Sequence, residues 1–313
     1  MTMKIDLIRN KFIECKNSNS YKRINAEHPV DIYVGYNDFN QQSFIVIANS
    51  EYMEVESSKL IEVKLFKRTD NRLTLSFCLL DDNMSDIFYQ FCSDIIEKTY
   101  HLNQYSPIPF VIDRWKKWVQ MFKNPTNILM TENEVRGLLG ELIFLNKYMF
   151  KKYGVHKSLE AWIGSSLSHK DFEIEDTWYE IKTIRENALT VEISSIEQLE
   201  SNLEGKLVII KLEPSNVSIS EPLSLNDYIK EIEKKLTSNE EIMLFNKRLD
   251  QRKYFYSEEY DKYVYCNKGI VNYVVKDNFP RIQHKDLKEG IARISYQLYI
   301  GKLKEYMEVG EID

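Results

Sequence analysis

Hydrophobic and polar positions alternate along four short segments in the first 130 residues. These segments are rich in β-branched and aromatic residues, and polar turns separate them, which is typical of antiparallel strands. We expect strands at 30–36, 43–49, 59–68 and 72–80. Apolar residues then recur at helical spacing over 84–100, and a further helix is expected at 114–122. The pattern predicts a mixed, largely β region at the start of the chain.

A long helix is expected to begin after Thr131. The segment TENE places Thr131 and Glu134 in the capping-box pattern, in which each side chain bonds the other residue's backbone N–H. Apolar residues then recur every three or four positions up to Met149, so one face of the helix should be buried. Gly137 predicts a notch at which this helix can approach a sheet closely.

The rest of the chain alternates between strand-like and helix-like patterns. A β-hairpin is expected from 171–175 and 178–184, around the turn Glu175-Asp176-Thr177. Further strands are expected at 188–194, 206–214, 253–257, 273–277 and 292–300, and helices at 195–203, 226–236 and 240–250.

Two domains are expected from this organisation. Residues 123–127 read KNPTN, and their proline and asparagines favour a turn between the two parts. We therefore expect a mixed α+β domain over 1–125 and an α/β domain over 126–313. Target recognition or partner docking is our hypothesis for the first of them.

Composition excludes several classes of protein. The 313 residues include only 10 Gly and 7 Pro, and 43% are hydrophobic, which argues against disorder and repeats. The four cysteines are scattered without a C-x-x-C pair, so neither a disulfide framework nor a zinc site is indicated. No apolar run has the length of a signal peptide or a membrane span. We expect a reduced, cytoplasmic protein that does not bind membranes.

Charge limits how the chain could bind a polyanion. The net charge is −6, with 16 basic and 16 acidic residues in 1–130 and 26 basic and 32 acidic residues in 131–313. Neither part has the excess of positive charge that drives bulk binding to nucleic acid. Contact with nucleic acid would need a local basic patch, a metal ion or a partner subunit.

Four charged residues form the candidate chemistry. Glu180 and Lys182 are two positions apart in an expected strand, so their side chains share a face, and the hairpin can bring Asp171 beside Glu180. Glu141 lies at the flank of the helix's apolar face. Adjacent carboxylates repel, so a cation is implied, and oxygen ligands without a His or Cys cluster favour Mg²⁺ or Mn²⁺. Taken singly, each residue is also explained as a surface ion pair, a turn aspartate or a boundary glutamate.

Taken together, the order of these residues resembles the PD-(D/E)XK nuclease superfamily. The shared order is a helix with a glutamate, a strand that begins with an aspartate, a hairpin, a strand with the E-x-K triplet and a following helix. The chain is most similar to a bacterial branch often encoded beside restriction-like and antiphage defence genes. The matching segments are GELIFL (140–145), HKDF (169–172), EIKT (180–183), ISSIEQL (193–199), FPRI (279–282) and GIARISYQL (290–298). The resemblance covers most of 110–313 and, less specifically, the N-terminal part. It departs from the usual motif where Lys170 replaces a proline before Asp171.

The resemblance implies a restriction-endonuclease-like mixed sheet flanked by helices and Mg²⁺-dependent hydrolysis of phosphodiester bonds, with Mn²⁺ as a substitute. Asp171, Glu180 and the carbonyl of Ile181 would hold the metal, and Lys182 would position the attacking water. Glu141 would hold a second metal or its water shell. Supporting or substrate-binding roles are expected for Gln198, Lys170, Thr183 and Arg185, and a structural role for Arg281.

The partner and substrate predictions leave alternatives open. DNA is the expected substrate, and RNA stays open because the motif reads only a phosphodiester and a metal. Double-strand cleavage usually needs two active sites, which favours a homodimer, and other defence-system proteins are candidate partners. The acidic net charge supports a second interpretation, a non-catalytic DNA-binding or assembly subunit of a bacterial defence complex.

Overall fold

The computed structural model describes residues 5–18, 20–100, 102, 107–122, 129–162, 169–215 and 223–308. The chain divides into two compact units, each described here by itself. Unit 1 comprises Met1–Leu129 with Phe255–Glu258, and unit 2 comprises Met130–Tyr254 with Glu259–Asp313. The turn expected at 123–127 lies outside the described residues.

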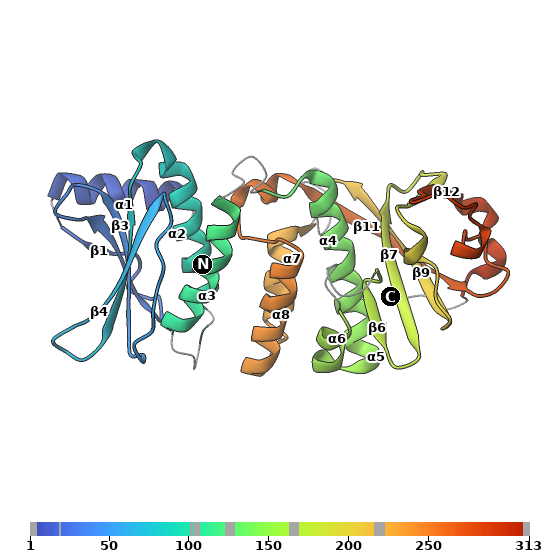
Figure 1. Cartoon of the computed structure of the whole chain (residues 1–313), viewed down its shortest axis with the longest axis horizontal. Helices are drawn as coiled ribbons and strands as arrows, with labels where there is room; N and C mark the ends of the chain where they lie inside the picture. The colour runs from blue at the N-terminus through green and yellow to red at the C-terminus, as the bar shows by residue number, and fades with distance from the viewer. Residues whose placement is uncertain are drawn as a thin grey trace. The chain divides into compact units, whose positions relative to one another are not determined.

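Unit 1 contains a five-stranded antiparallel sheet in the order β1-β2-β3-β5-β4 (Figure 1). The strands are β1 (Lys22–Arg23), β2 (Asp31–Tyr36), β3 (Gln42–Ala48), β4 (Ile61–Lys67) and β5 (Leu73–Leu79). Three helices share a hydrophobic core with this sheet: α1 (Ile5–Ser18), α2 (Ser85–Thr99) and α3 (Pro107–Phe122). The last four strands and α2 occupy segments predicted from the sequence, α3 begins well before the segment predicted at 114–122, and α1 was not predicted.

A buried aspartate ties the returning segment Phe255–Glu258 into unit 1. Asp94 is fully buried and accepts hydrogen bonds from Nε and Nη2 of Arg114, both at 2.6 Å, and from Nε1 of Trp118 at 2.8 Å. The backbone N–H of Tyr256 donates to the same carboxylate at 3.2 Å, and Phe255 packs edge-on against Trp118. These residues belong to no strand, so the strand predicted at 253–257 is wrong. Their aromatic side chains are instead part of a core.

Unit 2 contains a five-stranded mixed sheet in the order β10-β11-β9-β7-β6, in which β7 and β9 are parallel and the other neighbours antiparallel. Its strands are β6 (Phe172–Ile174), β7 (Thr177–Ile184), β9 (Gly205–Pro214), β10 (Leu223–Ser224) and β11 (Val264–Val275). A second, two-stranded sheet pairs β8 (Thr190–Ile193) with β12 (Tyr296–Tyr299). The described chain is therefore a mixed α/β protein with several sheets.

Helices of unit 2 accompany these sheets. They are α4 (Glu132–Phe144), a π-helical turn (Leu145–Met149), α5 (Phe150–Tyr153), α6 (Val155–Ala161), α7 (Leu225–Glu233) and α8 (Asn239–Gln251). The helix predicted at 195–203 is only one 3₁₀ turn, η4 (Ile196–Gln198), because Gly205 already starts strand β9. β11 is much longer than the segment predicted at 273–277, and β12 is shorter than the one predicted at 292–300.

The contact of α4 with β7 positions the candidate site. The capping box of Thr131 and Glu134 forms as expected, and the apolar stripe from Val135 to Met149 is buried. The close approach occurs at Gly140 rather than Gly137. A Cβ at Gly140 would lie 2.2 Å from Cγ2 of Thr183, whereas one at Gly137 would meet nothing within 4 Å. α4 therefore lies directly against β7, as Figure 1 shows, and Glu141 follows the residue of closest approach in α4.

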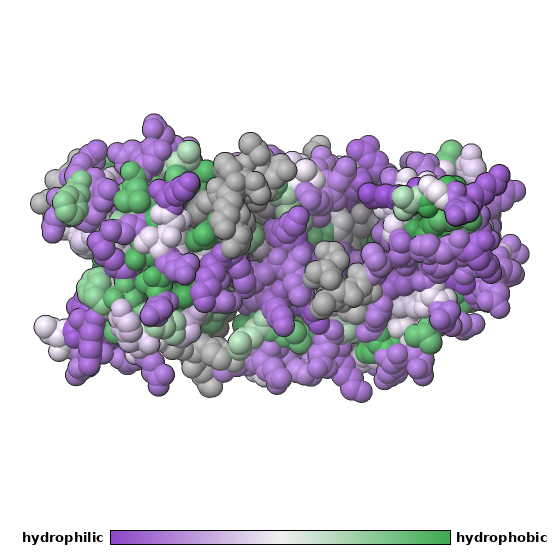
Figure 2. Space-filling model, viewed as in Figure 1, coloured by the Kyte–Doolittle hydropathy of each residue, from purple (hydrophilic) through white to green (hydrophobic). Residues whose placement is uncertain are grey.

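Figure 2 shows how hydrophilic and apolar residues are distributed over one face of the molecule. Hydrophilic residues cover most of the face in Figure 2, with apolar residues in small areas among them. Among the helices that the structure describes, none is both long and apolar enough to span a bilayer.

Candidate active site

The β6–β7 hairpin sets the spacing of the candidate carboxylates. Ile174 pairs directly with Thr177, so the turn has two residues instead of the three we expected. Glu175, in the turn, adopts the left-handed conformation with φ of 53°, as tight two-residue hairpin turns require. The pairing ends with Phe172 opposite Tyr179, and Asp171 and Glu180 are the next residues on the two sides of the hairpin.

Asp171 is fixed to the backbone of β7. Its N–H donates to the carbonyl of Tyr179 at 3.2 Å, and its Oδ2 accepts the N–H of Ile181 at 2.8 Å. The carboxylate therefore lies beside the E-x-K segment because of strand pairing and needs no contact from a distant loop. A third bond, between its Oδ1 and Nη2 of Arg252 at 3.2 Å, comes from the end of α8.

Glu180 and Lys182 point to the same side of β7 and form an ion pair. Nζ of Lys182 lies 2.9 Å from Oε1 of Glu180, and their side chains are 16% and 3% exposed. The ammonium also donates to Oε1 of Gln198 at 2.9 Å. Among the described residues, none donates a hydrogen bond to the second oxygen of Glu180, Oε2.

Glu141 joins this group through Arg252. Its Oε2 accepts from Nη2 of Arg252 at 2.6 Å and from Nε1 of Trp162 at 2.7 Å. The same Nη2 contacts Asp171, so one buried guanidinium bridges the two carboxylates. The sequence alone points to neither Arg252 nor Trp162, since Arg252 is 81 residues away from Asp171 and has no motif around it.

Electrostatics show an excess of negative charge at this site. Burial and, after it, the nearby Asp171 carboxylate together raise the pKa of Glu180 to about 8, and Lys182 opposes the shift. Burial also raises the pKa of Glu141 to about 8, with Arg252 opposing and Asp171 adding. Burial would lower the pKa of Arg252, but its carboxylate neighbours outweigh it and raise that pKa. Three carboxylates thus share two cationic side chains.

The donor set fits a hard divalent cation. Among the residues that the structure describes, the site offers the carboxylates of Asp171 and Glu180 and the carbonyl of Ile181, no imidazole or thiolate joins them, and Oε2 of Glu180 accepts no hydrogen bond. Within the described ranges, no group of three or more His, Cys, Asp or Glu side chains forms a complete metal cage. Mg²⁺ usually takes one or two carboxylates and completes its shell with waters and substrate phosphates. A two-carboxylate site is therefore in keeping with Mg²⁺ chemistry.

The supporting residues expected from the sequence are placed differently from one another. Gln198 contacts Lys182, whereas Thr183 packs against Gly140 on the opposite side of β7. Lys170 is 6% exposed, and its ammonium bonds backbone carbonyls, so it does not point to a substrate phosphate. Arg185 is exposed and lines a groove of about 510 Å³ together with Arg136.

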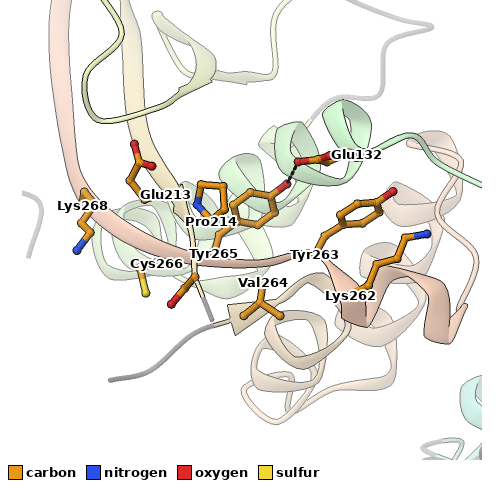
Figure 3. Close-up of a pocket in the computed structure, with 10 residues that line it drawn as sticks. Glu132, Glu213, Pro214, Lys262, Tyr263, Val264, Tyr265, Cys266 and Lys268 are labelled. Atoms are coloured by element: carbon orange, nitrogen blue, oxygen red, sulfur yellow. Dashed lines mark hydrogen bonds between the residues drawn. The ribbon is translucent and has the colours of Figure 1, made fainter. Parts of the chain in front are cut away.

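A separate pocket of about 410 Å³ lies in unit 2, where β9 ends and β11 begins (Figure 3). Tyr265 donates to Oε1 of Glu132 at 3.2 Å across it, and burial raises the pKa of this tyrosine to about 12. Two lysines and two glutamates line the pocket, so their charges cancel and do not favour a phosphate. None of the four predicted catalytic residues lines it.

Comparison with known families identifies the family of this chain. A family model described as "Putative PD-(D/E)XK family member, (DUF4420)" matches residues 9–301. The chain belongs to this family. The match confirms the resemblance to the superfamily and covers nearly the whole of both units. Members of the PD-(D/E)XK superfamily are typically nucleases and generally use divalent metal ions. No curated protein and no solved structure matches the chain.

Proposed function

We propose that this protein is a Mg²⁺-dependent endonuclease that hydrolyses phosphodiester bonds of DNA. The observation that carries the proposal is the convergence of Asp171, Glu180 and Lys182 on one hairpin, with more carboxylates than cationic side chains around them. A nuclease needs such an arrangement because charge develops on phosphate during hydrolysis, and a bound cation and an ammonium both stabilise it.

In the proposed mechanism, Asp171, Glu180 and the carbonyl of Ile181 hold Mg²⁺, and Mn²⁺ can replace it. When bound, the ion supplies Lewis-acid polarisation of the phosphate. Lys182 orients the attacking water with its ammonium, and its own orientation depends on Glu180 and Gln198. Two fixed acceptors leave the ammonium little freedom, which favours catalysis through prior organisation.

Glu141 has a less direct role in this proposal. Both of its hydrogen bonds use Oε2, so Oε1 has no donor among the residues that the structure describes. We assign this oxygen to a second metal ion or to the water shell of the first. Arg252 keeps the carboxylate in place on the side away from that oxygen.

The biological setting belongs to the same proposal. We propose a restriction-like or antiphage defence role in the bacterial cytoplasm, and we propose that unit 1 is a separate, largely β domain for target recognition or partner docking. Residues 1–125 and 126–313 would then be the two functional domains. Action as a homodimer would supply two active sites for a double-strand break.

The acidic charge favours one second candidate, a non-catalytic DNA-binding or assembly subunit of a defence complex. A subunit without a working site should gain no thermal stability from Mg²⁺. A metal-binding site should gain about RT ln(1 + [Mg²⁺]/Kd). Thermal melts with Mg²⁺ and with EDTA therefore separate the two candidates.

The decisive test is a cleavage assay on plasmid DNA, phage DNA and matched RNA, with Mg²⁺, Mn²⁺ or EDTA. Metal-dependent cleavage by the natural protein should be lost in Lys182→Ala and Asp171→Asn. Lys268→Ala, which removes an exposed lysine of the same unit, is the matched control and should cleave normally. Equal cleavage by Lys182→Ala and the control would refute the assignment, and faster cleavage of RNA would correct the substrate.

A further inference from the structure

The short turn η4 is held by two cations that come from distant parts of unit 2. The carbonyls of Glu197 and Glu200 accept hydrogen bonds from Nζ of Lys170 at 2.5 and 3.0 Å. The carbonyl of Leu199, between them, accepts from Nη1 of Arg281 at 2.7 Å. The last carbonyls of a helical turn have no partner within the turn and carry partial negative charge, so cations suit them.

Lys170 is built into this position and is not a solvated side chain. It is 6% exposed, and its ammonium lies 3.9 Å from the ring centre of Trp178. The indole is itself fixed, because its Nε1 donates to the carbonyl of Leu203 and a Cβ at Gly205 would lie 2.0 Å from it. An ammonium that is removed from water needs such compensation, from carbonyls and from an aromatic face.

The pinned turn carries the residue that orients Lys182. Gln198 lies between Glu197 and Leu199, and its Oε1 accepts both the N–H of Ser194 at 2.8 Å and Nζ of Lys182 at 2.9 Å. A shift of the turn would therefore move the acceptor of Lys182. The contacts run without a break from Lys170 to the turn, from the turn to Gln198, and from Gln198 to Lys182.

We propose that Lys170 is a positioning residue for Lys182, and that it acts by holding the backbone on both sides of Gln198. Arg281 holds the same turn from the C-terminal part of the chain. Lys170 occupies the position where the motif usually has a proline. Its proposed role is to hold the turn and not to contact phosphate. The effect on catalysis rests on the proposed nuclease function, whereas the chain of contacts does not.

Steady-state kinetics test the catalytic part. Lys170→Met and Gln198→Leu should each lower kcat about 10- to 100-fold with KM little changed, the usual range for groups that orient a catalytic residue. Gln198→Glu keeps the acceptor and should stay within a few-fold of the natural protein. In the double variant Lys170→Met/Gln198→Leu, kcat should be little lower than in Gln198→Leu alone. The effects of two residues that act through the same contacts do not add. If the decrease in kcat of the double variant equals the product of the decreases in the two single variants, the proposal is overturned.

Hydrogen exchange tests the structural part without any need for activity. Lys170→Met should speed amide exchange over 194–200 on the order of fivefold or more, because the turn loses two hydrogen bonds. Lys206→Met is the matched control, since it removes a lysine that is 16% exposed and pairs with Glu308 instead. Unchanged exchange in Lys170→Met, or equal acceleration in the control, would overturn the proposal.

Two further outcomes are distinguishable. If the natural protein cleaves no substrate but Lys170→Met still speeds exchange over 194–200, the proposed function fails and the positioning link stands. If Lys170→Met does not fold, Arg281→Gln removes the opposite anchor and should speed exchange in the same segment. No acceleration there would refute the assignment of the turn as the shared element.

Discussion

Replacing Glu180 by glutamine is expected to stabilise the metal-free protein at about pH 8 but not at about pH 5. Burial, and then the neighbouring Asp171, raise the pKa of Glu180 from its ordinary 4.5 to about 8, against the opposing Lys182. Between about pH 4.5 and pH 8, Glu180 therefore keeps its proton in the folded protein and loses it in the unfolded chain. The contribution of this group to the free energy of unfolding is therefore largest below about pH 4.5 and falls as the pH rises to about 8.

The size of the effect follows from the two pKa values. One pKa unit corresponds to about 1.4 kcal/mol, so ionisation of this buried group costs on the order of 3 kcal/mol by about pH 7. Glutamine removes that cost and keeps an oxygen that can accept from Lys182, at a loss of about 1 kcal/mol for the weaker bond. The net gain of about 2 kcal/mol corresponds to roughly 4–8 °C in Tm for a unit of this size.

Thermal melts of the natural protein and Glu180→Gln, at several values between about pH 5 and pH 8, measure this effect. With EDTA the difference in Tm should open as the pH rises, and with saturating Mg²⁺ it should close, because only the natural site gains from the cation. Glu192→Gln, at an exposed position of the same unit, is the control and should show no such trend. Equal differences at both ends of the range, or a less stable Glu180→Gln at about pH 8, would refute the reasoning.

Three other substitutions test the packing around the site and in unit 1. Gly140→Ala should lower stability by about 1–3 kcal/mol, because the new Cβ meets Thr183, while Gly137→Ala should be neutral or slightly stabilising in parallel melts. Phe255→Ala should cost unit 1 about 3–5 kcal/mol by opening a cavity in its core, seen as faster hydrogen exchange in α2 and α3 but not in β7. Arg252→Gln removes the cation between two partly buried carboxylates and should cost up to about 3–5 kcal/mol, part of which Mg²⁺ restores. An Arg252→Gln protein as stable as the natural one in EDTA would contradict the electrostatic argument.

Local patterns predicted the elements that carry the motif. A strand has a period of two, so Glu180 and Lys182 were expected on one face, and they form an ion pair there. The capping box at Thr131 was readable because its two partners are three residues apart. One local signal was missed: Ile8, Phe12 and Cys15 of α1 recur at helical spacing, and all three are buried.

Some local patterns were interpreted wrongly because packing decided the outcome. The segment 253–257 has the aromatic content of a strand. In the structure Phe255 packs in the core of unit 1, and the backbone N–H of Tyr256 donates a hydrogen bond to Asp94. Gly137 and Gly140 lie on the same helix, and only the tertiary contact with Thr183 shows which of them needs to lack a side chain. Sequence spacing carries no information about such close approaches.

The sequence by itself determined the family, the hairpin and the identity of the charged residues on it, because these depend on short-range periodicity and on motifs of a few residues. The pairing of Lys182 with Glu180 followed from strand periodicity, whereas only the tertiary structure decided which distant cations reach the carboxylates and the turn η4. Arg252 reaches Asp171 from 81 residues away, and Lys170 and Arg281 meet at η4 from opposite sides of the motif. Buried charges must find partners wherever the fold brings them, and no sequence distance limits that search.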